Sequence, residues 1–176
     1  TAVTGIWQTV WLEQVDSAHF TSVHFIPSLD SVEVFVQASE SGSVCMEVLE
    51  EDSCITAHTF TAGGSQTVSF EAPRLWTPEQ PFLYRVRLSL LRAGRETDRV
   101  ESYFGLRTFA VQPDENGTPY FLLNGRPYFQ KGLLDQGYWP DGLYTAPSDE
   151  ALRRDIEQAK ALGFNMLRKH IKVEPA

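Results

Sequence analysis

The sequence lacks most of the features that would assign it at once to a class of protein. Two cysteines among 176 residues are too few for a disulfide-stabilised fold. Cys45 and Cys54 could at best face each other across a hairpin, and we predict free, buried thiols. There is no apolar run of the roughly 20 residues that cross a bilayer. The first residues also lack the basic start and apolar stretch of a signal peptide, so we expect no membrane partner, and a cytoplasmic or an exported location stays open.

The charge balance and the histidines exclude further classes. A net charge of -8 repels phosphate backbones, so binding of a nucleic acid would need a local basic patch. The only dense basic cluster, at residues 168–172, is more simply a charged strand end that meets solvent. None of the four histidines has a cysteine or acidic neighbour at metal-ligand spacing, and no phosphate-binding loop occurs. We therefore predict no nucleic-acid partner, no metal site and no cofactor.

From residue 6 to about residue 112 the dominant pattern is alternation with a period of two, which is typical of strands that bury one face. It is seen in SVEVFVQ (31–37), in SVCMEVLE (43–50) and most clearly in PFLYRVRLSLL (81–91). Short polar segments of turn-forming residues separate these runs. Seven short strands between His19 and Arg107 predict an immunoglobulin-like β-sandwich.

The pattern changes after about residue 112. Asn124-Gly125 lies between two apolar runs and predicts a hairpin turn. Ser148 is a suitable N-cap for an amphipathic helix, Gly163 suits its C-terminal end, and FNMLRKH (164–170) is strand-like. Strand, loop, helix and strand form the unit of a parallel sheet. Because a complete (β/α)₈ barrel takes about 250 residues and about 65 remain here, we expect a mainly β chain that ends in an incomplete barrel segment with one main helix.

Several stretches resemble the family 2 glycoside hydrolases, which include β-galactosidases, β-glucuronidases and β-mannosidases. The stretches are TGIWQTVWLEQV (4–15), RLWTPEQPFLYRVRLSL (74–90), DRVESYFGLR (98–107), FLLNGRPYFQKGLL (121–134) and LGFNMLRKH (162–170). They follow the family's order over nearly the whole chain. The resemblance implies that residues 1–16 are the last strand of a jelly-roll sugar-binding domain and that 17–111 are the immunoglobulin-like domain. Residues 112–176 are then the start of a truncated catalytic barrel.

The resemblance also implies a retaining β-glycosidase, whose chemistry needs two carboxyl groups about 5–5.5 Å apart. In the family these are two glutamates at the ends of later barrel strands, and neither position exists in this sequence. Asp135, Asp141 and Glu174 follow strand-like runs, but no spacing places two of them on one face. We therefore expect no catalytic residue and no turnover in this fragment, whereas its parent protein is expected to be a glycoside hydrolase, most simply β-galactosidase-like.

Substrate-binding residues are expected at the ends of the first two barrel strands. Arg168 matches the arginine with which the family keeps its nucleophilic carboxylate ionised. His170 stands two residues later, whereas the better-known family pattern has histidine three residues later, so it is either a sugar ligand or a residue of the other face. Asp135 and Gln136 offer hydrogen bonds to hydroxyls. Trp139 either stacks on a sugar or packs the loop.

Two functions remain open at this point. The first is the truncated β-glycosidase, which meets a β-glycoside only through its parent protein and self-associates through the unfinished barrel segment. The alternative is a non-catalytic β-sandwich module that binds carbohydrate or another protein. In either case the positive charge near the C-terminus is interpreted as part of a fragment boundary and not as a functional tail.

Overall fold

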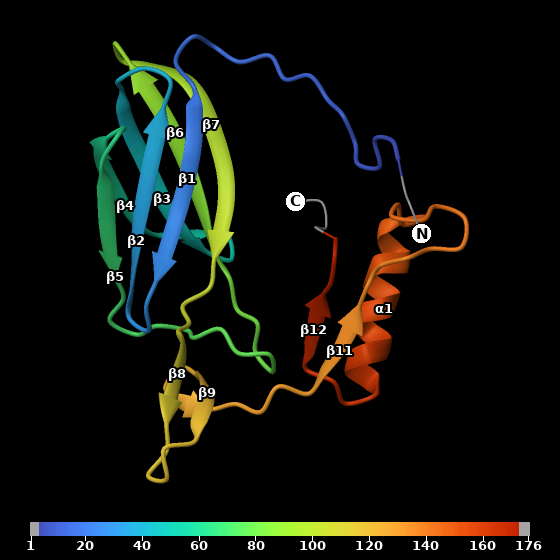
Figure 1. The fold of residues 1–176 in the computed structure, drawn as a ribbon. Coiled ribbons are helices and arrows are strands. Elements are labelled where there is room, and N and C mark those ends of the chain that lie inside the picture. Colours follow the sequence, from blue (N-terminus) through green and yellow to red (C-terminus); the bar gives the residue numbers. More distant parts are fainter. Residues whose placement is uncertain (1–3, 173–176) are drawn as a thin grey trace. The chain divides into compact units, whose positions relative to one another are not determined.

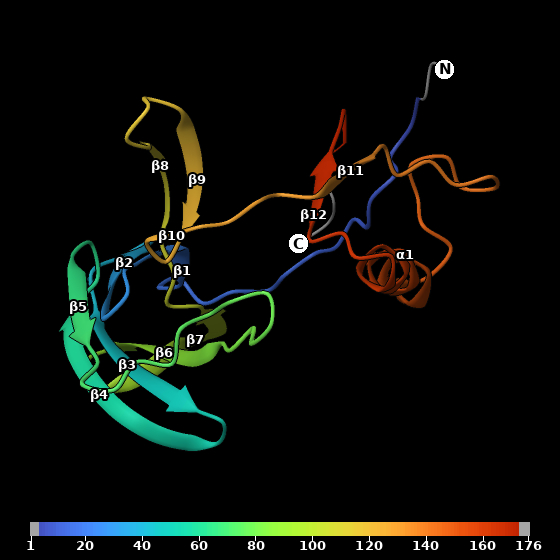
Figure 2. The same ribbon diagram turned by 90° about the horizontal axis from the view of Figure 1, so that it is seen from below.

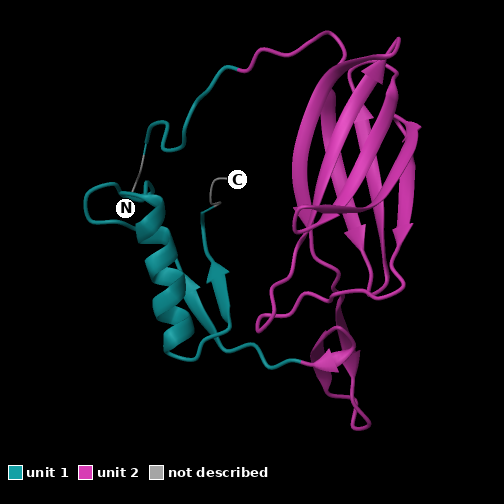
Figure 3. Cartoon of the chain, turned by 180° about the vertical axis from the view of Figure 1, so that it is seen from behind, with its two compact units in different colours: residues 1–12, 128–176 teal, residues 13–127 magenta. Residues whose placement is uncertain are grey.

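The computed structural model describes residues 4–172, in which the chain is mainly β-strand with one helix. The chain divides into two compact units, one of residues 13–127 and one formed by residues 1–12 with 128–176 (Figure 3). No helix in the described range is long and apolar enough to cross a membrane.

The larger unit contains a sandwich of two antiparallel sheets, as predicted, with seven strands between Phe20 and Phe104 (Figures 1 and 2). The first sheet has the order β1-β2-β5 and the second has the order β4-β3-β6-β7. The strand bounds are β1 Phe20–Pro27, β2 Ser31–Ala38, β3 Ser43–Glu50, β4 Ser53–Thr61, β5 Ser65–Ser69, β6 Tyr84–Arg92 and β7 Arg95–Phe104.

The core lies between the sheets and follows the alternation of the sequence. The inward residues of β2, β3 and β6 are buried, and Val34, Met46 and Leu88 are fully inaccessible. The outward face of β6 is charged: Arg87 bonds Glu47 at 3.0 Å and Glu101 at 3.3 Å. These two hydrogen bonds raise the pKa of the Arg87 guanidinium. Charged cross-strand pairs on the solvent-exposed face and apolar pairs on the core-facing side fix the register of the sheet.

The prediction of free thiols agrees with the structure, but the prediction that both are buried is wrong. Cys45 is half-buried and Cys54 is exposed. Val44 and Met46 are the inward residues of β3, so Cys45 faces outward. The hairpin pairs Cys45 with Thr59 and Cys54 with Leu49, so the cysteines do not face each other.

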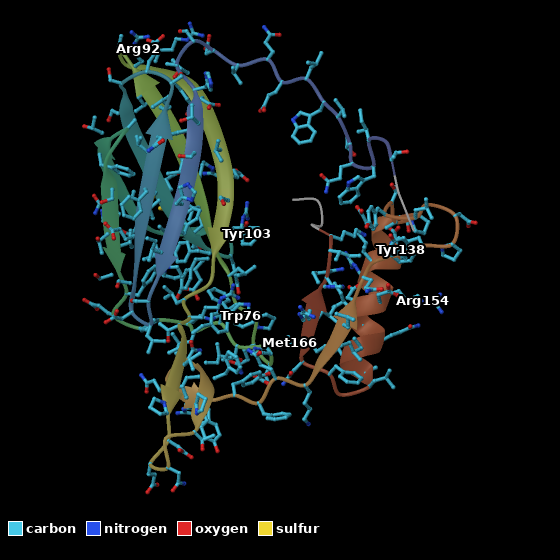
Figure 4. The ribbon with its side chains drawn as sticks, in the orientation of Figure 1. Trp76, Arg92, Tyr103, Tyr138, Arg154 and Met166 are labelled. Atoms are coloured by element: carbon cyan, nitrogen blue, oxygen red, sulfur yellow. The ribbon has the colours of Figure 1, made fainter. Side chains whose placement is uncertain are left out.

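A loop between β5 and β6 covers one end of the sandwich. Trp76 N–H donates to Leu106 O at 2.9 Å, and the Arg107 guanidinium stacks 4.3 Å from the Trp76 ring. A Cβ at Gly105 would lie 3.0 Å from Trp76 Cβ, so the loop approaches the backbone closely there. Trp76 and Arg92 lie at opposite ends of the sandwich (Figure 4). Trp76 therefore has a packing role at this end of the sandwich.

A three-stranded sheet follows, with the order β10-β9-β8. Its strands are β8 Phe109–Pro113, β9 Pro119–Leu123 and β10 Arg126–Pro127. Leu123 pairs with Arg126, so Asn124-Gly125 is the two-residue turn that the sequence predicts, with φ of 52° and 74°. Asn124 also joins this hairpin to the loop below the sandwich. Its Oδ1 accepts from Thr108 N–H at 3.0 Å, and its Nδ2 donates to Trp76 O at 3.0 Å.

Replacement of Asn124 tests how much its two side-chain hydrogen bonds, which join the hairpin to the loop, contribute to stability. Asn124→Gly keeps the positive φ but removes both side-chain hydrogen bonds, and we expect it to lower the free energy of unfolding by about 1–3 kcal/mol. Asn124→Ala should cost about 1 kcal/mol more, because a Cβ disfavours the left-handed region. Urea denaturation followed by circular dichroism measures both differences. Equal stability of Asn124→Gly and the unchanged chain would show that these two hydrogen bonds contribute nothing to the free energy of unfolding.

The smaller unit contains β11 (Gly132–Asp135), α1 (Asp149–Ala161) and β12 (Met166–Lys169), and β11 and β12 are parallel. Ser148 is the N-cap, as predicted, and its hydroxyl accepts from Ala151 N–H at 3.3 Å. Hydrogen bonds from its own backbone and from Ser148 lower the pKa of the Glu150 carboxyl. Gly163 follows the helix with φ of +85°. The predicted strand, loop, helix and strand are thus present.

The segment before β1 is assigned neither helix nor strand among residues 4–18. The jelly-roll strand expected for residues 1–16 therefore stays a prediction.

Candidate functional site

The candidate site lies at the carboxyl ends of β11 and β12. The parallel register places Leu134 beside Arg168 and Asp135 beside Lys169. His170 N–H donates to Asp135 O at 2.9 Å and extends the pairing by one residue. The two strands therefore bring four of the five predicted site residues, Asp135, Gln136, Arg168 and His170, to one edge of the sheet.

Asp135 holds the loop that follows β11. Its Oδ2 lies 2.5 Å from Lys169 Nζ, and its Oδ1 accepts from Gly137 N–H at 2.8 Å. Both oxygens thus already have partners, and the charge is balanced by a neighbouring ammonium. This arrangement gives Asp135 a structural role, and its contact with a sugar stays a prediction.

Gln136 and His170 form the only direct side-chain pair among the predicted residues, within the described part of the chain. Gln136 Nε2 lies 3.2 Å from His170 Nδ1. An amide N–H can only donate, so with the amide in this orientation the neutral imidazole carries its proton on Nε2. His170 Nε2–H is then a donor that suits a hydroxyl or carboxylate oxygen. The loop end of β11 thereby sets the orientation of the imidazole.

Arg168 belongs to the sheet face opposite α1. Side chains alternate along a strand, and Leu167 and Lys169 line a pocket with the helix residues Leu152 and Ile156. Arg168 therefore points to the other face, next to Leu134. It is exposed, and no ion pair to it is found among residues 4–172. A guanidinium in this position is available to pair with a carboxylate.

Trp139 packs within the loop after β11, and its stacking on a sugar stays a prediction. Trp139 N–H and Leu143 O, and Leu143 N–H and Trp139 O, form reciprocal bonds of 2.8 Å and 3.0 Å. The indole lines a pocket of about 200 Å³ beside α1. Its Nε1–H is buried without a hydrogen-bond partner in the described structure. Tyr138 is the more accessible ring, with 39% of its surface exposed.

Three residues of this region were missed by the sequence analysis. The Trp7 ring lies 5.7 Å from Tyr144, and Lys172 Nζ donates to Gly137 O at 3.1 Å. No local pattern could predict the first contact, since Trp7 and Tyr144 are separated by the whole sandwich in the sequence. Lys172 was noted only as part of a basic cluster.

Metal binding has no geometric support in the described residues. No group of three or more His, Cys, Asp or Glu side chains converges there in a way that could hold an ion. Two other carboxylates, Asp141 and Glu174, were considered from the sequence. Asp141 is exposed in the loop, and Glu174 lies outside the described residues.

Comparison with known proteins identifies the family. The family model for the glycosyl hydrolases of family 2 matches residues 18–107, which is just over half of the chain. The chain therefore belongs to family 2 of the glycosyl hydrolases. A β-galactosidase of Thermoanaerobacter pseudethanolicus is 26% identical over 93% of this chain and 24% of its own length.

Solved structures show the same fold. A family 2 member from Bacteroides cellulosilyticus matches with a TM-score of 0.74 and 24% identity over 90% of this chain and 23% of its own. The β-glucuronidase 3 of Bacteroides uniformis matches with a TM-score of 0.75 and 22% identity over 90% of this chain and 21% of its own. The chain thus spans about a quarter of the length of these relatives.

Proposed function

We propose that this chain is part of a retaining β-glycosidase that hydrolyses O-glycosyl bonds in carbohydrate metabolism, with a β-galactoside as the first substrate to test. The observation that carries the proposal is the family match over residues 18–107. The β-galactosidase relative, which aligns with 93% of the chain, supports the choice of sugar.

We assign the three parts of the chain to the three predicted domains. Residues 1–16 end a jelly-roll domain, 17–111 form an immunoglobulin-like spacer, and 112–176 begin the catalytic barrel. The strand orders β1-β2-β5 and β4-β3-β6-β7 support the second part, and the parallel β11-α1-β12 unit supports the third. In a barrel, the face of β11 and β12 opposite α1 is the inner face, and the strand ends carry the active site.

Within that barrel the residues of this chain have binding roles. Arg168 pairs with the nucleophilic carboxylate and keeps it ionised, because a nearby opposite charge favours the charged form. His170 donates Nε2–H to a substrate oxygen, and Gln136 fixes its tautomer. Asp135 and Trp139 shape the loop, with Asp135 as a further hydrogen-bond acceptor for the sugar. Both catalytic glutamates come from later strands of the longer protein.

The 176-residue chain should therefore not turn over any substrate by itself. With p-nitrophenyl β-galactoside we expect nitrophenolate release at the buffer rate, because a retaining mechanism needs two carboxylates on opposite sides of the anomeric carbon. The longer protein should hydrolyse the same substrate. Reproducible hydrolysis by the purified chain would contradict the assignment of the glutamates to later strands.

We also expect the chain to self-associate through the β11-α1-β12 unit. Leu134, Ile156 and Leu162 have 57%, 56% and 75% of their surface exposed. Leu134→Glu should weaken association by about tenfold or more, since burial of a leucine contributes roughly 1.5–3 kcal/mol. Sedimentation velocity over a concentration series measures this, with Leu29→Glu in the sandwich unit as the control. A single monomeric species at all concentrations would contradict the expectation.

A further inference from the structure

The N-terminal segment is part of the candidate site's own unit. Trp7 lies 5.7 Å from the Tyr144 ring at an interplanar angle of 59°, and Tyr144 lies 4.9 Å from Tyr138. Thr145 Oγ1 donates to Trp7 O at 2.9 Å. The ring and the backbone of Trp7 are therefore both bound by the loop between β11 and α1.

A lysine links this aromatic cluster to the strand ends. Lys172 Nζ lies 5.6 Å from the Trp7 ring centroid and donates to Gly137 O at 3.1 Å. A Cβ at Gly137 would lie only 2.7 Å from Lys172 Nζ, and Gly137 has φ of +59°. Gly137 N–H in turn donates to Asp135 Oδ1 at 2.8 Å. Trp7 thus contacts the loop at its far end through Tyr144 and at its first residues through Lys172.

Gln136, which orients His170, lies between Asp135 and Gly137 at the start of this loop. Anchoring of Gly137 on both sides restricts the backbone of Gln136 as well. The other tryptophan of the segment, Trp11, has 73% of its surface exposed and takes part in no ring contact within the described part of the chain. Trp11 is therefore a tryptophan of the same segment that lacks the ring contacts of Trp7.

We infer that Trp7 is a positioning residue of the candidate sugar site: it holds the loop of residues 136–147 so that Gln136 keeps His170 oriented at the strand ends. The inference rests on the proposed function for the nature of the ligand. The anchoring itself does not depend on catalysis.

Amide hydrogen exchange in the 176-residue chain, read by NMR, tests the anchoring. The amide N–H groups of Trp139 and Leu143 each donate to the other residue's carbonyl oxygen across the loop. In Trp7→Ala these amides should exchange about tenfold faster, because the loop can then open locally without the cost of breaking the ring contacts of Trp7. Trp7→Phe retains a ring against Tyr144 and should restore most of the protection. Trp11→Ala is the matched control and should change exchange less than twofold. Unchanged Val34 and Val86 amides verify that the sandwich is folded.

The same spectra report on the site. The imidazole signals of His170 should shift in Trp7→Ala and stay in place in Trp7→Phe and Trp11→Ala. If Trp7→Ala and Trp11→Ala give the same exchange rates and the same His170 signals, the inference is wrong. In the longer enzyme, Trp7→Ala should raise KM for the aryl glycoside about tenfold. If Trp7→Ala speeds amide exchange as expected but the unmutated longer protein has no glycosidase activity, the proposed function is wrong and the inference that Trp7 anchors the loop is still supported.

Discussion

Leu88→Ala should lower the free energy of unfolding of the sandwich by about 3 kcal/mol. Leu88 is completely buried in β6, where it pairs with Met46 on β3 and with Val100 on β7. Removal of its side chain loses the transfer free energy of three carbons and leaves a cavity between two sheets that cannot collapse freely. A domain of this size has a total stability of about 5–15 kcal/mol, so the loss is a large fraction.

Urea denaturation followed by far-ultraviolet circular dichroism measures the effect. With an m-value of about 1–3 kcal/mol/M, the midpoint should fall by about 1–3 M urea without a change in slope. Ile55→Ala on β4 is the matched control, because Ile55 is largely exposed, and it should cost under about 1 kcal/mol. Equal midpoints for the two variants would show that the core is not where the structure places it.

Arg168→Ala should lower kcat/KM of the longer enzyme by about 10²–10³-fold, the usual effect of removing one preorganised donor from a charged site. Arg168 is on the face of β12 opposite α1 and has no ion-pair partner among the described residues. We propose that it pairs with the nucleophilic carboxylate. Loss of the positive charge then raises the pKa of that carboxylate, so the acid limb of the pH profile of kcat/KM should move to higher pH.

Two further variants separate charge from structure. Arg168→Lys keeps the charge but loses the forked geometry, and it should give an intermediate loss. Arg154→Ala on the solvent side of α1 (Figure 4) should leave kcat/KM unchanged within about twofold. If Arg168→Ala lowers activity with no movement of the acid limb, the proposed pairing with the nucleophile is wrong.

Much of this fold follows from local sequence rules. The buried valines of β2, the turn at Asn124-Gly125 and the cap at Ser148 each depend on residues within a few positions, and all three were predicted. The exposure of Cys54 was not predicted, because thiols are usually buried and the hairpin end that exposes this one has no distinct signal.

The candidate site was predictable only in part. The alternation of strand, helix and strand in the sequence predicted where β11 and β12 end. The ion pair between Asp135 and Lys169 depends on the register of the two parallel strands, and the register cannot be read from the sequence of either strand alone. The loop packing of Trp139 depends on tertiary contacts as well, as does the contact of Trp7 with Tyr144 across more than a hundred residues. Both are side-chain contacts that only the folded chain creates.

The most direct test of the account is the stereochemistry of hydrolysis by the longer protein. With p-nitrophenyl β-galactoside, proton NMR should show the β-anomer of the free sugar first and the α-anomer only later, as mutarotation proceeds. The configuration of the anomeric carbon is inverted once when the covalent intermediate forms and again when water hydrolyses it, so the product retains the β configuration. The 176-residue chain should release nothing under the same conditions. Initial release of the α-anomer, or no hydrolysis of any β-galactoside, β-glucuronide or β-mannoside, would contradict the assignment to a retaining β-glycosidase.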